Sequence, residues 1–326
     1  MRITVLGAGA WGTALARMLA QSEHQITLWD YFPETLDQIR KTGRNERFLP
    51  GVELPPDLEL QSDVAKAVAG AELVVVAIVS KALRDATKCL SGFAGCVVSV
   101  TKGIEYETGL TMSGILATNA PAARIAAMSG PTFALEVARG VPTAIVVASR
   151  DPATAGTVQK VFHSPTFRVY TSNDLLGVEL GGALKNVVAI GAGVGDGMGF
   201  GDNTKAALVT RAISEIRRLG VACGAQAETF TGLSGLGDLM VTCFSRLSRN
   251  RGFGERLGKG EKATDILAGM VAVAEGYPTA RSAHQVAQKH GVSTPVINEV
   301  YAMLYEGKDV RQTVHDLMAR DFKAED

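Results

Sequence analysis

The chain has 326 residues, of which 46% are hydrophobic and 20% charged, a composition that suits a globular protein with two domains. Its 33 basic residues balance its 33 acidic residues, so no overall electrostatic field draws the protein to nucleic acid or to an acidic membrane surface. The four cysteines form no CxxC pair and the five histidines lack metal-ligand spacing, so we expect reduced thiols and no metal site.

The first residues, MRITVLGAG, read as a strand that runs directly into a glycine turn, with no apolar leader before it. We see no uninterrupted apolar run of about 18 residues, the length that crosses a membrane. We therefore expect a cytoplasmic protein with no stable membrane insertion.

Short β-branched runs alternate with helical patterns in the first half of the chain, which predicts parallel strands joined by crossover helices. The predicted strands are 3–6, 25–29, 73–79, 96–100, 125–128, 144–148 and 167–170. From about residue 175, long helical patterns such as 205–219 and 277–290 replace them. We therefore predict an α/β protein with a Rossmann-type doubly wound parallel sheet in residues 1–178 and an all-helical C-terminal domain in residues 179–326.

The segment GAGAWG, which contains Ala10 and Trp11, follows the first predicted strand and precedes a helical pattern at 13–21. Its Gly7, Gly9 and Gly12 form GxGxxG, which allows a tight turn, a close approach of the backbone to a pyrophosphate, and close packing of helix on strand. The N-terminus of the helix would offer N–H groups to the phosphates. A glycine-rich turn without a ligand is the alternative, but this strand-turn-helix context favours a dinucleotide.

Asp30 follows the second predicted strand, where a carboxylate can accept hydrogen bonds from the adenosine ribose and repel a 2′-phosphate. Tyr31 comes next, with no basic residue beside it. This pattern favours NAD over NADP. Arg40 or Arg44 could overturn the preference by folding over the adenosine, and a solvated aspartate at a strand end is the alternative for Asp30.

Three further charged residues are candidates for a functional site. Lys102 follows the strand predicted at 96–100, at the sheet edge where ligands bind in doubly wound folds. Lys185 lies among apolar neighbours, which lower the pKa of an ammonium group, although such a lysine is also typical of a side chain that reaches out to solvent. Asp238 follows a glycine turn, where a helix-capping role is equally typical.

Six segments follow one another in order and are spread across nearly the whole chain. They are GAGAWGTALA (7–16), TKGIE (101–105), SGPTFALEVARGVPTA (129–144), GGALKNVVAIGAGVGDGMGFGDNTKAAL (181–208), GLSGLGDLMVTCFSRLSRNRGFG (232–254) and VAEGYPTA (273–280). Together they closely resemble the bacterial NAD(P)-dependent glycerol-3-phosphate dehydrogenases. The resemblance implies reversible hydride transfer between NAD(P)H and dihydroxyacetone phosphate to give sn-glycerol 3-phosphate, a supply of glycerophospholipid biosynthesis, and a homodimer.

The resemblance also implies roles for single residues. Lys185 matches the catalytic lysine, Asp238 the acid beside it, and Lys102 a lysine at the substrate that also contacts the cofactor. Asn186 and Thr242 match polar positions that hydrogen-bond the substrate or the lysine, although bonds between helices are an open alternative.

The remaining matches concern ligand binding. The substrate phosphate is expected at Ser248, Arg249 and Asn250, with Gly130 and Thr132 beside the substrate. Further cofactor contacts are expected at Ala134, Arg249, Val273 and Glu275. The alternative for Ser248, Arg249 and Asn250 is a solvated basic turn. The alternative for Gly130, Thr132 and Ala134 is an ordinary turn. Val273 and Glu275 could instead be a core valine and a capping glutamate.

Two other functions stay open from the sequence. A β-hydroxyacid or 6-phosphogluconate dehydrogenase has a similar build, but it would need carboxylate-binding residues where this chain carries SRNR. A protein that senses NAD without turnover is the second, and an assay of NADH oxidation with dihydroxyacetone phosphate separates it from an enzyme.

Overall fold

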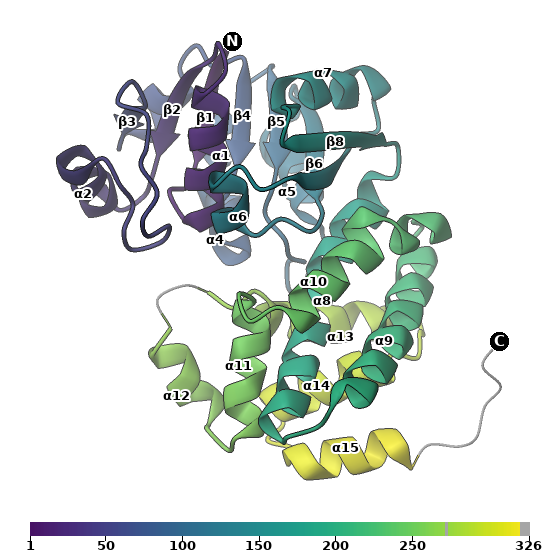
Figure 1. Cartoon of the computed structure of the whole chain (residues 1–326). Coiled ribbons are helices and arrows are strands. Elements are labelled where there is room, and N and C mark those ends of the chain that lie inside the picture. The colour runs from purple at the N-terminus through teal and green to yellow at the C-terminus, as the bar shows by residue number, and fades with distance from the viewer. Residues whose placement is uncertain (271–272, 320–326) are drawn as a thin grey trace.

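A computed structural model describes residues 1–270 and 273–319 (Figure 1). Its sheet has the strand order β3-β2-β1-β4-β5-β6-β7-β8. The strands are β1 (Arg2–Leu6), β2 (Gln25–Trp29), β3 (Glu59–Gln61), β4 (Leu73–Val76), β5 (Cys96–Ser99), β6 (Arg124–Ser129), β7 (Thr143–Ala148) and β8 (Phe167–Ser172). All seven predicted strands are confirmed, and the predicted doubly wound α/β fold is confirmed with them. The three-residue β3 was not predicted, because it is too short to show a period.

One strand pair departs from the predicted parallel sheet. β7 runs antiparallel to β6, whereas the other neighbouring strands pair in parallel. The link between them contains only the five-residue helix α6 (Ala134–Ala138), which packs against α1 (Ala10–Ala20). A parallel connection requires a crossover helix on the sheet, so without one the chain turns back.

The central strands are buried on both faces, which explains their continuous apolar runs. In β4, Val75 packs with one core cluster while Val74 and Val76 pack with another. Helices α1, α2 (Pro33–Thr42) and α7 (Pro152–Phe162) contribute to the first cluster, and α3 (Val64–Val68), α4 (Ser80–Ala86) and α5 (Met112–Asn119) to the second.

Helices of six to 23 residues make up the second half of the chain, in the lower part of Figure 1. They are α8 (Leu175–Gly197), α9 (Asp202–Ala222), α10 (Asp238–Phe244), α11 (Arg249–Gly258), α12 (Ala263–Ala268), α13 (Gly276–Lys289), α14 (Pro295–Tyr305) and α15 (Val310–Met318). The predicted helical character of this half is confirmed. The division at residue 178 stays a prediction; residues 271–272 and 320–326 of the predicted second domain lie outside the described residues.

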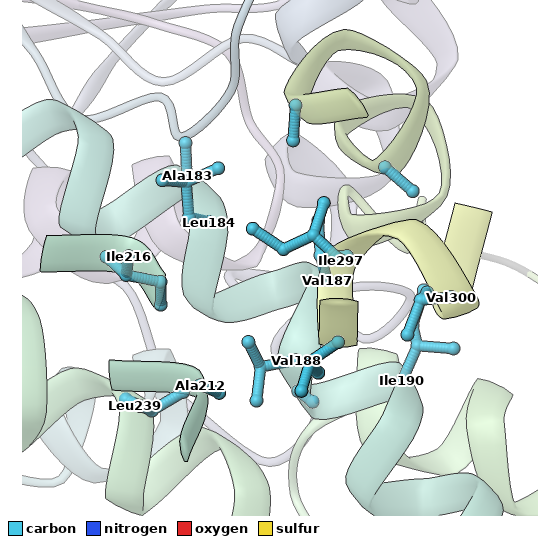
Figure 2. Packing of buried hydrophobic residues seen from close by; sticks show 14 of the residues in the cluster. Ala183, Leu184, Val187, Val188, Ile190, Ala212, Ile216, Leu239, Ile297 and Val300 are labelled. Atoms are coloured by element: carbon cyan, nitrogen blue, oxygen red, sulfur yellow. The ribbon is translucent and has the colours of Figure 1, made fainter. Parts of the chain in front are cut away.

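Helix α8 is the centre of the helical half. Its buried side chains pack against α9, α10 and α14, as Figure 2 shows for Leu184, Val188 and their neighbours. Although no uninterrupted apolar run predicted it, α8 is long and apolar enough to cross a membrane, but 89% of its most apolar window is buried in the protein. It is therefore the core helix of this half. Glycines on α8 and α11 let the two backbones touch, which brings the start of α11 against α8.

Candidate active site

The glycine turn follows β1 and leads into α1. A Cβ atom on Gly12 would lie 1.9 Å from the carbonyl oxygen of Gly7, so only glycine fits there. The helix begins after Gly9, and no side chain in the described part of the chain caps its first turn. The free N–H groups of this turn fit the pyrophosphate of a dinucleotide.

Asp30 lies directly after β2 and faces the same turn. Its carboxylate accepts hydrogen bonds from the backbone N–H groups of Ala8 at 2.6 Å and Phe32 at 2.9 Å. Tyr31, the next residue, has 75% of its surface exposed. The carboxylate therefore holds the turn in place and keeps further oxygen lone pairs for a ligand.

The two arginines that could reach the adenosine have other partners. Arg40 donates to Asp37 and to the carbonyl oxygen of Leu60, each at 2.7 Å. Arg44 pairs with Glu53 at 2.6 Å. Asn45 was not among the predicted site residues, but it also contacts the glycine turn. It is fully buried, and its amide donates to the carbonyl oxygen of Ala8 at 2.8 Å.

Four side chains from three distant segments meet at the start of α10. Lys185 of α8 donates to the carboxylate of Asp238 and, at 2.7 Å, to the hydroxyl of Thr242. Lys102, which follows β5, donates to the second carboxylate oxygen of Asp238 at 2.5 Å. Only 1% of the Asp238 side chain and 8% of the Lys185 side chain are exposed. The structure thus joins four of the predicted catalytic residues in one buried network, which we call the lysine cluster: Lys102, Lys185, Asp238 and Thr242.

The path of the chain explains how Asp238 and Thr242 come together. A π-helical turn, Leu233–Gly237, leads directly into α10, which begins at Asp238. Residues four apart lie on one face of an α-helix, so Asp238 and Thr242 both face Lys185. Wide helical turns of this kind frequently occur at functional sites.

Burial controls the charge of Lys185. The pKa of its ammonium group is lowered to about 7. Loss of solvation is the largest cause; the negative charge of Asp238 raises the pKa, and the positive charge of Lys102 lowers it. An amine with a pKa near neutrality can both accept and donate a proton at working pH.

The hydrogen bonds also fix where the free electron pair of Lys185 points. The hydroxyl of Thr242 donates to the carbonyl oxygen of Asp238 at 2.6 Å, so toward Lys185 it can only accept. A neutral Lys185 then uses both N–H groups, one on Asp238 and one on Thr242. Its lone pair is directed away from these two partners, where a proton donor can reach it.

The start of α11 lies against α8, next to Asn186. Ser248 caps this helix by accepting from the N–H of Arg251 at 3.2 Å. Asn250 is buried and bonds to Asn186, the neighbour of Lys185. Arg249 is exposed as a residue, but loss of solvation around its guanidinium lowers the pKa of that group, and the charge of Glu275 raises it.

Glu275 connects the helical half to the sheet half. Its carboxylate accepts from the N–H of Ser80 at 3.0 Å and from the Ser80 hydroxyl at 2.6 Å, at the first residue of α4. Ser80 is the second residue missing from the predicted set. No local pattern marks Ser80 or Asn45, because their partners lie 195 and 37 residues away along the chain.

The remaining predicted residues lie around these groups. Gly130 offers its carbonyl oxygen to Lys102 at 3.4 Å and to the hydroxyl of Thr132 at 3.1 Å. Ala134 is the first residue of α6, and Val273 lies half-buried two residues before Glu275. Within the described residues, no hydrogen bond joins Tyr31, Ala134 or Val273 to the lysine cluster, and no group of three potential metal ligands occurs.

Comparisons with known proteins cover the whole chain. Residues 2–155 match the family model of the N-terminus of NAD-dependent glycerol-3-phosphate dehydrogenase, and residues 174–315 match the model of its C-terminus. A glycerol-3-phosphate dehydrogenase (NAD(P)+) from Geobacter sulfurreducens is 48% identical over 99% of this chain and 98% of its own length. One from Anaeromyxobacter dehalogenans is 50% identical over 100% of both chains. The solved structure of the Coxiella burnetii enzyme superimposes with a TM-score of 0.94 at 35% identity, over 98% of this chain and 99% of that one.

Proposed function

The chain belongs to the NAD-dependent glycerol-3-phosphate dehydrogenase family, and we propose that Lys185 moves the proton in its reaction. The protein is an oxidoreductase that uses NAD(P) and interconverts dihydroxyacetone phosphate and sn-glycerol 3-phosphate. The observation that carries the assignment of Lys185 is its burial against Asp238 and Thr242, which leaves one direction open for a ligand.

In the reducing direction, NAD(P)H held at the glycine turn would supply a hydride to the carbonyl carbon of the substrate. The carbonyl oxygen gains negative charge and takes a proton from the ammonium group of Lys185, so that an alcohol forms and a neutral amine remains. In the oxidising direction, the lone pair of neutral Lys185 takes the hydroxyl proton, and the hydride from the same carbon would pass to NAD(P)+, so that the ketone and NAD(P)H form. Asp238 and Thr242 hold the amine in a fixed orientation throughout.

Lys102 supplies a second positive charge next to the reacting oxygen. It extends from the carboxyl edge of the sheet and shares the carboxylate of Asp238 with Lys185. A cation at this position stabilises negative charge on the substrate oxygen as it develops. Asp238, which accepts from both lysines, partly offsets the repulsion between them.

The phosphate of the substrate is proposed to bind at the start of α11. Arg249 is exposed there and brings a guanidinium that can bind two phosphate oxygens at once. Ser248 and Asn250 flank it, and Gly130 and Thr132 adjoin Lys102. Binding the phosphate at a distance from the reacting carbon aligns that carbon for hydride transfer.

The cofactor is proposed to lie across the glycine turn formed by Gly7, Gly9, Ala10, Trp11 and Gly12. Asp30 and Tyr31 would contact the adenosine end of the cofactor. Contacts from the opposite side of the cofactor are proposed for Lys102, Ala134, Arg249, Val273 and Glu275. NAD is the proposed preferred cofactor, because Asp30 is an acid and Arg40 and Arg44 are engaged elsewhere.

The assignment of the phosphate site is tested by substrates with and without phosphate. NADH oxidation is measured with dihydroxyacetone phosphate and with dihydroxyacetone, for the wild type and for Arg249→Ala. We expect the wild type to use the phosphorylated substrate far better and Arg249→Ala to raise its KM by about tenfold or more. Equal use of both substrates by the wild type would contradict the function, and an unchanged KM in the variant would contradict the role of Arg249.

Finer properties rest on the family resemblance. We propose a cytoplasmic homodimer whose product supplies glycerophospholipid biosynthesis. Light scattering of the purified protein tests the dimer.

A further inference from the structure

A loop after β5 crosses from the sheet half to the helical half. It comprises residues 103–110, which directly follow Lys102, and we call it the docking loop. Its Ile104 is buried and belongs to the core cluster of the helical half, together with side chains of α8 and α13. The chain that carries Lys102 is therefore anchored in the helical core two residues after that lysine.

Gln285 of α13 binds the tip of the docking loop. Its Oε1 accepts from the backbone N–H of Glu107 at 3.0 Å, and its Nε2 donates to the backbone carbonyl oxygen of the same residue at 3.2 Å. One side-chain amide thus pairs with both polar backbone groups of Glu107, as a residue of a neighbouring strand does in an antiparallel sheet. A change in the backbone dihedral angles of Glu107 would break at least one of these bonds.

The backbone of Glu107 needs such support. Its φ is +72°, in the left-handed region, and no other residue except glycine has a positive φ among residues 1–270 and 273–319. A Cβ atom is crowded in this conformation, which persists only where surrounding contacts enforce it. The turn bond from the N–H of Gly109 to the carbonyl oxygen of Glu105, at 3.0 Å, is one such contact. Gln285 supplies the others from the opposite half of the molecule.

α13 contacts the docking loop at more than one point. The guanidinium of Arg281 lies over the ring of Tyr106, 3.8 Å from its centroid, in a cation–π contact. Arg281 and Gln285 are four residues apart, so both lie on the same face of α13. A Cβ atom on Gly109 would lie 3.4 Å from the side chain of Val286. The docking loop is therefore seated along this face of the helix.

Lys102 bridges the two halves. Its backbone follows β5 of the sheet half, whereas its Nζ donates to Asp238 of the helical half at 2.5 Å. A Cβ atom on the next residue, Gly103, would lie 2.5 Å from the Cβ of Ser80, so the loop has no room to shift toward α4. The contact between Lys102 and Asp238 thus depends on how the docking loop is held against the helical half.

We propose that Gln285 is a positioning residue, which holds the docking loop on α13 and thereby keeps Lys102 in contact with Asp238 and the reacting oxygen of the substrate. This inference rests on the proposed function of the lysine cluster and adds a residue that lies outside it. Across the residues that the structure describes, no hydrogen bond joins Gln285 to the lysine cluster. Gln285 therefore acts on turnover only through the docking loop.

A displaced Lys102 changes the charge around Lys185. The positive charge of Lys102 lowers the pKa of Lys185, and the negative charge of Asp238 raises it. When Lys102 withdraws, Lys185 loses the positive neighbour and no longer shares the carboxylate, so both changes raise its pKa. The thiol of Cys243 also lies nearby, but burial raises its pKa to about 12 and it stays neutral at working pH. The pH profile of the enzyme thus reports the position of Lys102.

Gln285→Met tests the positioning role, because methionine keeps the length of the side chain and loses both strong hydrogen-bonding groups. We expect kcat for dihydroxyacetone phosphate reduction to fall about tenfold, with NADH affinity changed less than about threefold. The apparent pKa in kcat/KM for oxidation of sn-glycerol 3-phosphate should rise above that of the wild type. An unchanged kcat, or a lower kcat with an unchanged apparent pKa, would overturn the proposal.

Two further variants separate positioning from a folding defect. Gln288→Met is the matched control, since it makes the same substitution one turn further along α13, where the amide bonds to His284 of the same helix. It should keep the wild-type kcat and apparent pKa. Should Gln285→Met not fold, Arg281→Lys keeps the charge and loses the planar stack on Tyr106. It should raise the apparent pKa as well, and an unchanged value there would count against the docking loop.

A double-mutant cycle with Lys102→Met identifies the route of the effect. If Gln285 acts through Lys102, the double variant has the kcat of Lys102→Met alone, whereas losses that multiply would overturn the proposal. The same cycle separates the two levels of the account. Wild-type kcat in Lys102→Met would refute the proposed function of Lys102 and the positioning role with it. A slow Lys102→Met beside a fully active Gln285→Met would refute the positioning role alone.

Discussion

The glycine turn after β1 and the lysine cluster differ in which atoms form them. Backbone atoms make the turn, and its key residues lie within six positions of each other, from Gly7 to Gly12. Side chains make the cluster, and its members come from positions as far apart as Lys102 and Asp238. A backbone-built site depends on where side chains are absent, which local spacing reveals. A side-chain-built site depends on how distant segments pack.

The substitution with the largest expected effect disrupts the lysine cluster and leaves the glycine turn intact. Lys185→Met removes the transferable proton and keeps a side chain of similar length, so we expect kcat to fall at least about 10³-fold while NADH affinity changes less than about threefold. Steady-state rates and NADH fluorescence titration measure the two quantities. Lys205→Met is the matched control, because Lys205 is a partly buried lysine, with 11% of its side chain exposed, that also pairs with an aspartate, Asp196 at 2.6 Å. Retention of a tenth of wild-type kcat by Lys185→Met would remove that residue from the catalytic role.

The next effect acts on the turn alone. In Gly12→Ala the new Cβ would lie 1.9 Å from the oxygen of Gly7, so both the melting temperature and NADH binding should fall. In Gly9→Ala nothing lies within 4 Å of the new Cβ, so the fold should persist while NADH binds about tenfold more weakly. Thermal unfolding and NADH titration on both variants separate fold from cofactor contact. Undiminished NADH affinity in Gly9→Ala would show that the cofactor does not approach this backbone.

The smallest effect concerns the choice between NADH and NADPH. Asp30 faces the turn, and its charge would repel a 2′-phosphate by roughly 1–4 kcal/mol, depending on solvent screening. We expect the wild type to prefer NADH by about tenfold in kcat/KM and Asp30→Asn, which is nearly isosteric, to lose most of that preference. Equal values for the two cofactors in the wild type would contradict the prediction. An unaltered ratio in the variant would assign the preference to another residue.

The same contrast explains how far the sequence could predict the structure. The seven predicted strands and the glycine turn follow from local patterns, and the structure contains them. The direction of β7 does not follow, because periodicity is identical in parallel and antiparallel strands. The pairing of Ser80 with Glu275 was not predicted either, since neither residue's neighbours hint at the other.

Lys185 shows where resemblance to a family added what spacing could not. Its apolar neighbours alone favour a lysine that reaches out to solvent over a buried base. The structure shows it buried against Asp238 and Thr242. Its role in proton transfer stays a prediction, as do the ligand contacts of Arg249 and Glu275.

The pH dependence of kcat/KM in both directions tests the role of Lys185 most directly. Burial lowers the pKa of Lys185 to about 7, so the residue is charged below that pH and neutral above it. Oxidation of sn-glycerol 3-phosphate needs the neutral amine and should rise through about pH 7, whereas reduction of dihydroxyacetone phosphate needs the ammonium and should fall through the same point. The second ionisation of the substrate phosphate, near pH 6, is the same in both directions and can be subtracted. Opposite profiles that cross at one pKa near 7 are the predicted result; profiles that stay flat from pH 6.5 to about 9, or that bend near the ordinary lysine pKa of about 10.4, would contradict proton transfer by Lys185.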